Sequence, residues 1–144
     1  MNLEVKVETR IPKPVHEVFE AITDKDKISN YFVREASASM TPGAEITWDF
    51  GKYGKGEVKV HKVERSRRVV FGWETTQVEI ILQPEDDGTL VKIRETGWTE
   101  VNQKSIDEIT DRTQGWTDML LCMKAYLQFG VDLREPARVT EKVM

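Results

Sequence analysis

SIDEITDRTQGWTDMLLCMKAYLQFG, residues 105–130, is the stretch that decides the fold. It opens with Ser105 and Glu108 at the spacing of a capping box, and it ends at Gly130, a residue suited to the left-handed turn after a helix. Between them, side chains recur every three or four residues, which places them along one stripe of a helix. The stripe consists of Ile109, Thr113, Trp116, Leu120, Met123 and Leu127. We therefore predict one long helix over residues 105–129, with its first half the more exposed to solvent.

Length and composition indicate a single globular domain. The chain has 144 residues, of which 39% are apolar and 32% charged, and its net charge is −4. We predict one domain over residues 1–134 and a tail over residues 135–144. Acidic and basic residues are mixed, so nucleic acid is not an expected partner. The densest basic run, residues 65–68, is too short to form a phosphate-binding face and is interpreted as a solvated turn.

Hydropathy and cysteine content predict a cytoplasmic protein. No apolar run approaches the ~18 residues that a membrane span needs. The first residues lack the apolar core of a signal peptide. Cys122 is the single cysteine, so an internal disulfide is excluded and a reducing compartment is expected.

Upstream of the long helix, apolar and polar residues alternate in the manner of half-buried strands. The alternating segments are residues 3–11, 44–50, 58–60, 69–73, 78–82 and 91–98. Two short helical segments, at residues 14–23 and around 28–32, follow the first of them. Strands that follow one another without intervening helices form antiparallel sheets. We predict an α+β fold, in which a curved antiparallel sheet of about six or seven strands carries the long helix over its concave face.

The order and spacing of four motifs resemble one family. Residues 115–130 resemble its closing helix, with a Gly-Trp opening and a Leu-Lys-x-Tyr-Leu-x-x-Gly end, although Met123 replaces the first Leu. Residues 40–48 resemble its Pro-Gly turn before an aromatic strand. Residues 88–97 resemble its last strand, and residues 11–22 its first strand-to-helix turn. The chain is identified as similar to the START-like, helix-grip (SRPBCC) superfamily, in the branch of heat-shock-protein-90 ATPase activator homologues.

The resemblance implies a cavity between sheet and helix, and large apolar side chains are expected to line it. The wall candidates are Trp48, Phe50, Phe71, Trp73, Trp116, Met119, Leu120 and Met123. The alternative is a filled core, because aromatic residues at sheet and helix spacing usually serve packing. Gly115 is unfavourable in the middle of a helix, which indicates either a close approach or a bend.

Glu95 is the sharpest single candidate. Its place in the strand puts it on the same face as Val91 and Ile93, where a carboxylate would be buried and would need a partner. One hypothesis makes it a polar group that orients a ligand, or an acid–base group. The alternatives are a bulge that turns it outward, or an ion pair with Arg94, Arg34 or Lys92.

Other chemistry is not indicated. His16 and His61 lack metal-ligand spacing, and Cys122 is expected to be a small buried side chain. Residues 51–56 are rich in glycine, but no helix follows them to bind phosphate. No metal, cofactor or catalytic residue is expected.

Three functions are compatible with these observations. The first is non-catalytic binding of a small hydrophobic or amphipathic molecule, such as a lipid or polyketide, oriented by Glu95 or the hydroxyl of Tyr31. The second, implied by the branch and its link to stress response, is regulation of a chaperone through surface contacts. The eukaryotic activators carry an additional N-terminal domain that this sequence lacks, so strong ATPase activation is not expected. The third is a cyclase or dehydratase that uses Glu95. A monomer and a homodimer are both compatible with the sequence.

Overall fold

The computed structural model describes residues 2–134, and the predicted tail at 135–144 lies outside the described residues. Seven strands, two short helices, one 3-10 turn and one long helix follow one another along the chain. They are β1 (Leu3–Ile11), α1 (Val15–Thr23), α2 (Lys25–Ile28), β2 (Glu35–Ala36), β3 (Glu45–Asp49), η1 (Gly51–Tyr53), β4 (Lys55–Glu64), β5 (Arg68–Trp73), β6 (Thr76–Glu85), β7 (Gly88–Trp98) and α3 (Gln103–Phe129). This order confirms the predicted α+β helix-grip architecture.

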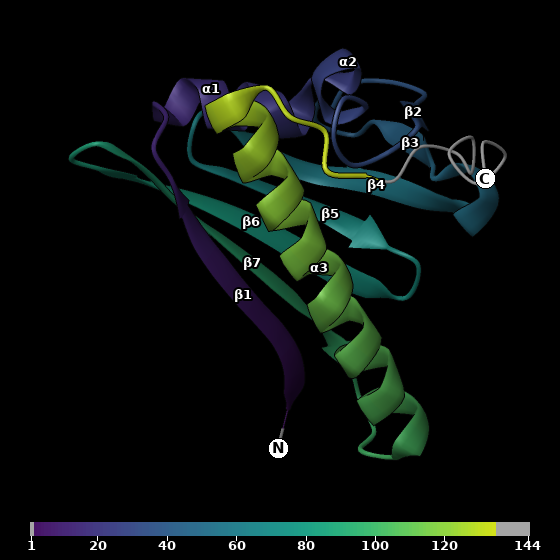
Figure 1. Cartoon of the computed structure of the whole chain (residues 1–144). Helices are drawn as coiled ribbons and strands as arrows, with labels where there is room; N and C mark the ends of the chain where they lie inside the picture. Colours follow the sequence, from purple (N-terminus) through teal and green to yellow (C-terminus); the bar gives the residue numbers. More distant parts are fainter. Residues whose placement is uncertain (1, 135–144) are drawn as a thin grey trace, which may run out of the picture.

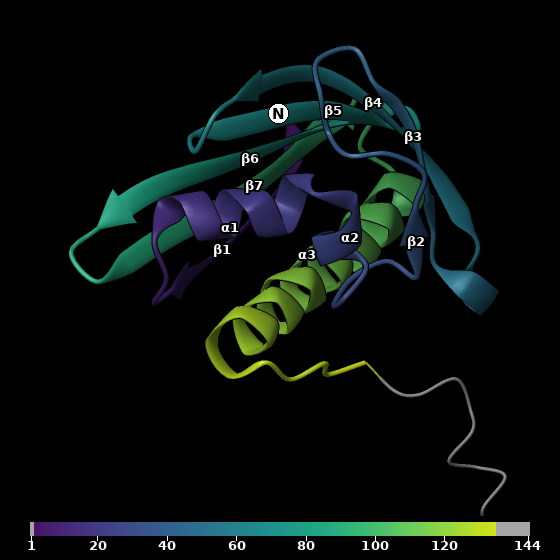
Figure 2. The ribbon, with the colours of Figure 1, turned by 90° about the horizontal axis from the view of Figure 1, so that it is seen from above.

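The strands form one antiparallel sheet in the order β1-β7-β6-β5-β4-β3-β2. The sheet curves around α3, which crosses its concave face diagonally, while α1 and α2 lie at one end of the molecule (Figures 1 and 2). β1 is joined to β7, far along the chain, and Ile11 pairs with Thr89. At this end of the pair, a side chain on Gly88 would collide with the carbonyl oxygen of Ile11, so glycine is required there.

The long helix begins two residues earlier than predicted, because its N-cap is Asn102 and not Ser105. The Asn102 side chain accepts a hydrogen bond from the backbone N–H of Ser105 at 2.9 Å. The Ser105 hydroxyl accepts one from the backbone N–H of Asn102 at 3.0 Å. The predicted box of Ser105 and Glu108 is therefore wrong by one helical turn. The helix ends at Gly130, which has the predicted left-handed conformation.

The two halves of α3 are anchored differently. Its first half, up to Gly115, has Ser105 as its buried residue, whereas Trp116, Met119, Leu120 and Met123 are all buried in the second half. This confirms the prediction that the first half is the more exposed. Most of the apolar contact with the sheet therefore comes after Gly115. No atom beyond its chain neighbours and its own helix backbone lies within 4 Å of the position that a side chain would take there, so a close approach does not explain this glycine.

Candidate functional site

Glu95 lies in the interior, on the face of β7 that looks toward α3. Its side chain is 0% exposed, as the alternation along the strand predicted. It pairs with Val78 of β6 in regular register and with Val5 of β1, and the β1–β7 register shifts just beyond that pair, between Glu95 and Trp98. The expected irregularity before Gly97 is therefore present, but the alternative in which it turns Glu95 outward is wrong, because Glu95 is buried.

Three groups satisfy the Glu95 carboxylate. The indole N–H of Trp116 donates to Oε1 at 2.7 Å, and the hydroxyl of Thr76 lies 2.6 Å from Oε2. The guanidinium of Arg112 forms an ion pair with the same Oε2 and a second one with Glu74, whose Oε1 lies 2.7 Å from Nη2. The Arg112 side chain is 20% exposed, so the buried charge of Glu95 is connected to the surface by one arginine. We call the following five residues the Glu95 cluster: Glu95, Trp116, Thr76, Arg112 and, at the rim, Glu74.

The partner of Glu95 differs from all three that the sequence suggested. Arg94 is engaged by Glu4 at 2.9 Å instead. Arg94 and Lys92 stand on the opposite face of β7, because neighbouring side chains of a strand point to opposite sides. In the described residues, neither Lys92 nor Arg34 forms an ion pair with Glu95. The sequence held a signal for the true partner: Arg112 falls between Ile109 and Trp116 on the apolar stripe of the helix, where a charge needs an internal partner.

The predicted aromatic residues come together next to this cluster. Trp48 is central, with ring centroids 5.5 Å from both Phe71 and Trp73. Phe71 lies 6.4 Å from Trp116 of α3. Trp48, Phe71 and Trp116 are buried, while Phe50 and Trp73 are partly exposed.

Phe32 was not among the predicted wall residues, but its ring joins the two sides of this aromatic cluster. Its centroid lies 5.2 Å from Phe50 and 6.1 Å from Trp116. The sequence predicted a short helix around residues 28–32, but α2 ends at Ile28 and Phe32 lies in the irregular segment after it. Met119, Leu120 and Met123 are buried along α3 in the same core. Side chains thus occupy the space between sheet and helix.

Two other candidates are engaged or shielded. The hydroxyl of Tyr31 donates to the backbone oxygen of Ala21 at 2.9 Å. Contrary to the prediction, it is therefore not available to orient a ligand. Burial raises the pKa of the Tyr31 phenol. Cys122 is only partly buried, and burial raises the pKa of its thiol, which makes the thiolate scarce at neutral pH.

Two surface hollows lie away from the Glu95 cluster or at its rim. One, of about 330 Å³, lies over β4 and includes Glu74 and Thr76 in its wall. The other, of about 280 Å³, lies beside α1. Within residues 2–134, no three His, Cys, Asp or Glu side chains gather in a way that could hold a metal ion. None of the helices in that range combines the length and hydropathy needed to cross a bilayer.

Comparisons with known proteins agree with this fold. The sequence profile of the family described as Activator of Hsp90 ATPase homolog 1-like protein matches residues 12–128. The crystal structure of SSP2350 from Staphylococcus saprophyticus is 25% identical, with a TM-score of 0.81, over 92% of this chain and 96% of that one. The search of curated proteins found no match.

Two further solved structures resemble the chain. DynU16, of the dynemicin biosynthetic locus, is 28% identical with a TM-score of 0.82, and the match covers 92% of this chain but 49% of DynU16. The Aha1 dimer from Colwellia psychrerythraea is 19% identical with a TM-score of 0.76, over 89% of this chain and 98% of that one. At this low identity the second likeness concerns the fold alone.

Proposed function

The chain belongs to the family of Activator of Hsp90 ATPase homolog 1-like proteins, and from that premise we propose that it binds a small hydrophobic or amphipathic molecule between sheet and α3. The family and its fold support ligand binding or a regulatory role in general. The observation that carries the finer proposal is the Glu95 cluster, a buried carboxylate and an arginine at the edge of six aromatic rings. Such a combination of apolar surface and few polar groups is typical of ligand sites.

A ligand enters this site when the first half of α3 moves away from the sheet. That half is held mainly by polar contacts: the Trp98 indole N–H donates to Glu108 at 3.0 Å, and Arg112 binds Glu95 and Glu74. Its apolar contribution to the core comes from Ile109, which is only partly buried. The second half is fixed by buried apolar side chains. Gly115 stands at the boundary, and glycine accommodates a change of backbone direction more readily than other residues. We therefore propose that Gly115 is the hinge.

In the open form, the aromatic side chains bind the apolar part of the ligand and the Glu95 cluster binds its polar group. An apolar ligand body that buries about 200 Å² against Phe50, Trp73 and Phe32 gains about 5 kcal/mol, at ~25 cal/mol per Å². A hydroxyl of the ligand would donate to Glu95, or an anionic group would bind Arg112. Met119 and Met123 line the same core, and their flexible side chains adapt to ligands of different shape.

Titration of intrinsic tryptophan fluorescence with dodecanoate and with 2-naphthol tests this function. We expect saturable quenching by at least one of them. Replacing Glu95→Gln should weaken binding, and Trp73→Phe should reduce the signal change. Leu121→Ser is the matched control, because Leu121 is on α3 but 51% exposed and outside the aromatic cluster. A flat response to both compounds, or equal effects of Glu95→Gln and Leu121→Ser, would contradict the proposal.

A second candidate function is regulation of a chaperone through surface contacts. Large apolar side chains are exposed on α3 and directly after it, namely Leu121, Phe129, Val131 and Leu133. If they contact a chaperone, Leu121→Ser and Phe129→Ser should reduce any stimulation of the ATPase of purified heat-shock-protein-90, while Glu95→Gln should not. The same variants thus separate the two functions. The single cysteine supports a reducing compartment, so we propose that either function is exercised in the cytoplasm.

We propose no catalytic role for Glu95. An acid–base mechanism needs groups that exchange protons near neutral pH. The charged group nearest to Glu95 is the guanidinium of Arg112, which stays protonated in proteins. The third candidate, a cyclase or dehydratase, is therefore the least supported.

A further inference from the structure

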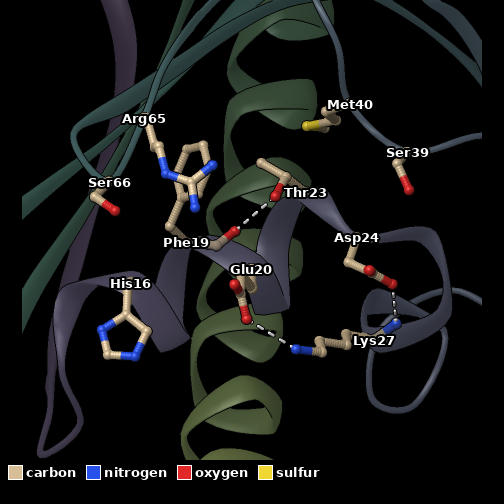
Figure 3. A pocket seen from close by; sticks show the side chains of 10 residues that line it. All are labelled: His16, Phe19, Glu20, Thr23, Asp24, Lys27, Ser39, Met40, Arg65 and Ser66. Atoms are coloured by element: carbon tan, nitrogen blue, oxygen red, sulfur yellow. Dashed lines mark hydrogen bonds and ion pairs between the residues drawn. The ribbon is translucent and has the colours of Figure 1, made fainter.

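The hollow beside α1 is lined by other residues, from other elements, than those of the Glu95 cluster. Figure 3 shows α1 and the start of α2 along one side, with the turn between β4 and β5 and the loop before β3 on the other. Its volume is about 280 Å³, close to the lower end of the range for small-molecule sites. The lining consists of His16, Phe19, Glu20, Thr23, Asp24, Lys27, Ser39, Met40, Arg65 and Ser66.

The floor of the hollow is apolar. Phe19 and Met40 are both buried, yet each contributes to the lining. Thr23 is buried beside them, and its hydroxyl is used internally, since it donates to the backbone oxygen of Phe19 at 3.0 Å. A compact apolar group that enters the hollow would therefore rest on Phe19 and Met40.

The two carboxylates of the lining already have partners within the protein. Lys27 binds Glu20 at 2.9 Å. This ammonium, with smaller contributions from His16 and Arg65, lowers the pKa of the Glu20 carboxyl. Asp24 accepts hydrogen bonds from the backbone N–H groups of Asp26 and Lys27 as the N-cap of α2. These carboxylates have little capacity left to bind a cation.

The remaining basic side chains of the lining are available to bind an anion. Arg65, Ser66 and His16 gather at one end of the hollow, opposite Ser39 and Asp24 (Figure 3). Among the residues that the structure describes, the Arg65 and His16 side chains take part in no hydrogen bond or ion pair, whereas Arg68, the first residue of β5, binds Glu79 at 2.5 Å. A guanidinium, an imidazole and a hydroxyl that converge in this way can all donate to one anionic group.

We propose that this hollow binds a small organic anion, a carboxylate attached to a compact apolar group. The carboxylate would lie between Arg65, His16 and Ser66, and the apolar group would lie on Phe19 and Met40. The volume of the hollow, about 280 Å³, suits a compact ligand. The site is separate from the one between sheet and α3, and it does not depend on it.

The test is a titration of the 15N-labelled full chain with benzoate, followed by amide chemical shifts in NMR spectra. A ligand of this size should bind with a dissociation constant on the order of 1 mM. We expect saturable shifts at the residues of the hollow. Arg65→Gln should weaken binding about tenfold, because one charge-assisted hydrogen bond is lost.

Arg67→Gln is the matched control. Arg67 is in the same turn, carries the same charge and is exposed, but it does not line the hollow. Its replacement should leave the affinity for benzoate within about twofold. Benzyl alcohol, which has the same ring without the charge, should bind more weakly than benzoate. Shifts that do not saturate, shifts outside the hollow, or equal effects of the two arginine variants would each overturn the proposal.

Discussion

Replacing Gly115→Ala should stabilise the protein, which is unusual for a change in the middle of a packed element. Glycine in a helix interior costs about 1 kcal/mol relative to alanine. The new methyl group would meet nothing within 4 Å beyond its chain neighbours and its own helix backbone, so no steric strain offsets this gain. We expect the free energy of unfolding to rise by about 1 kcal/mol, and the melting temperature by about 4 °C.

Thermal and urea unfolding followed by circular dichroism measure this change, and Gly43→Ala provides the comparison. Gly43 also has no atom within 4 Å of the new side chain, but its φ is +82°, a left-handed backbone that costs other residues about 1 kcal/mol. The two variants should therefore shift stability in opposite directions, although both positions are equally open. A loss of stability in Gly115→Ala would refute the assignment of this residue as an unstrained helical position.

The same variant also tests the hinge. If a ligand binds only after the helix bends at Gly115, a helix stiffened by about 1 kcal/mol makes the open form roughly fivefold rarer. The apparent affinity for dodecanoate or 2-naphthol should then fall by the same factor. An unchanged affinity, in a variant that is measurably more stable, would show that ligands reach the site by another route.

Two further predictions concern buried polar groups. Arg112→Met leaves the buried Glu95 charge without its cation and should cost about 3 kcal/mol of stability in urea unfolding. The double variant with Glu95→Gln should recover much of this loss, and a double variant no more stable than Arg112→Met would contradict the pairing. Tyr31→Phe removes the hydrogen bond to Ala21 and should cost about 1 kcal/mol at pH 7. Burial raises the pKa of Tyr31, so the stability that the folded state draws from the protonated phenol is lost as the pH rises above about 10. The loss of stability in Tyr31→Phe relative to the original protein should therefore become smaller above that pH. A loss of stability that does not change with pH would refute this.

Periodic elements of this fold were predictable from sequence because each of their residues has a defined direction. The alternation in β7 placed Glu95 in the interior, and the three- and four-residue spacing in α3 placed Trp116 and Met123 against the sheet. Strands without intervening helices indicated an antiparallel sheet, although the pairing of β1 with β7 was not predicted.

What escaped prediction depends on the relation between elements. Arg112 meets Glu95 only because α3 crosses β7 at one particular position along the strand, and no local sequence pattern determines that position. Phe32 enters the aromatic cluster from an irregular segment. The N-cap was misplaced because Asn102 and Ser105 both favour caps, and the choice between them depends on where the chain leaves β7.

The pairing of β1 with β7 has a consequence for the order of folding. β1 leaves the ribosome before every other described element, but its partner strand is roughly 80 residues away in the chain, as Ile11 and Thr89 illustrate. The hairpins from β3 to β7 connect neighbours and can form as they are synthesised. β1 and then α3 must join last. Until then the apolar faces of both stay uncovered, so the nascent chain is most prone to aggregation late in synthesis, when nearly all of its sheet is already formed.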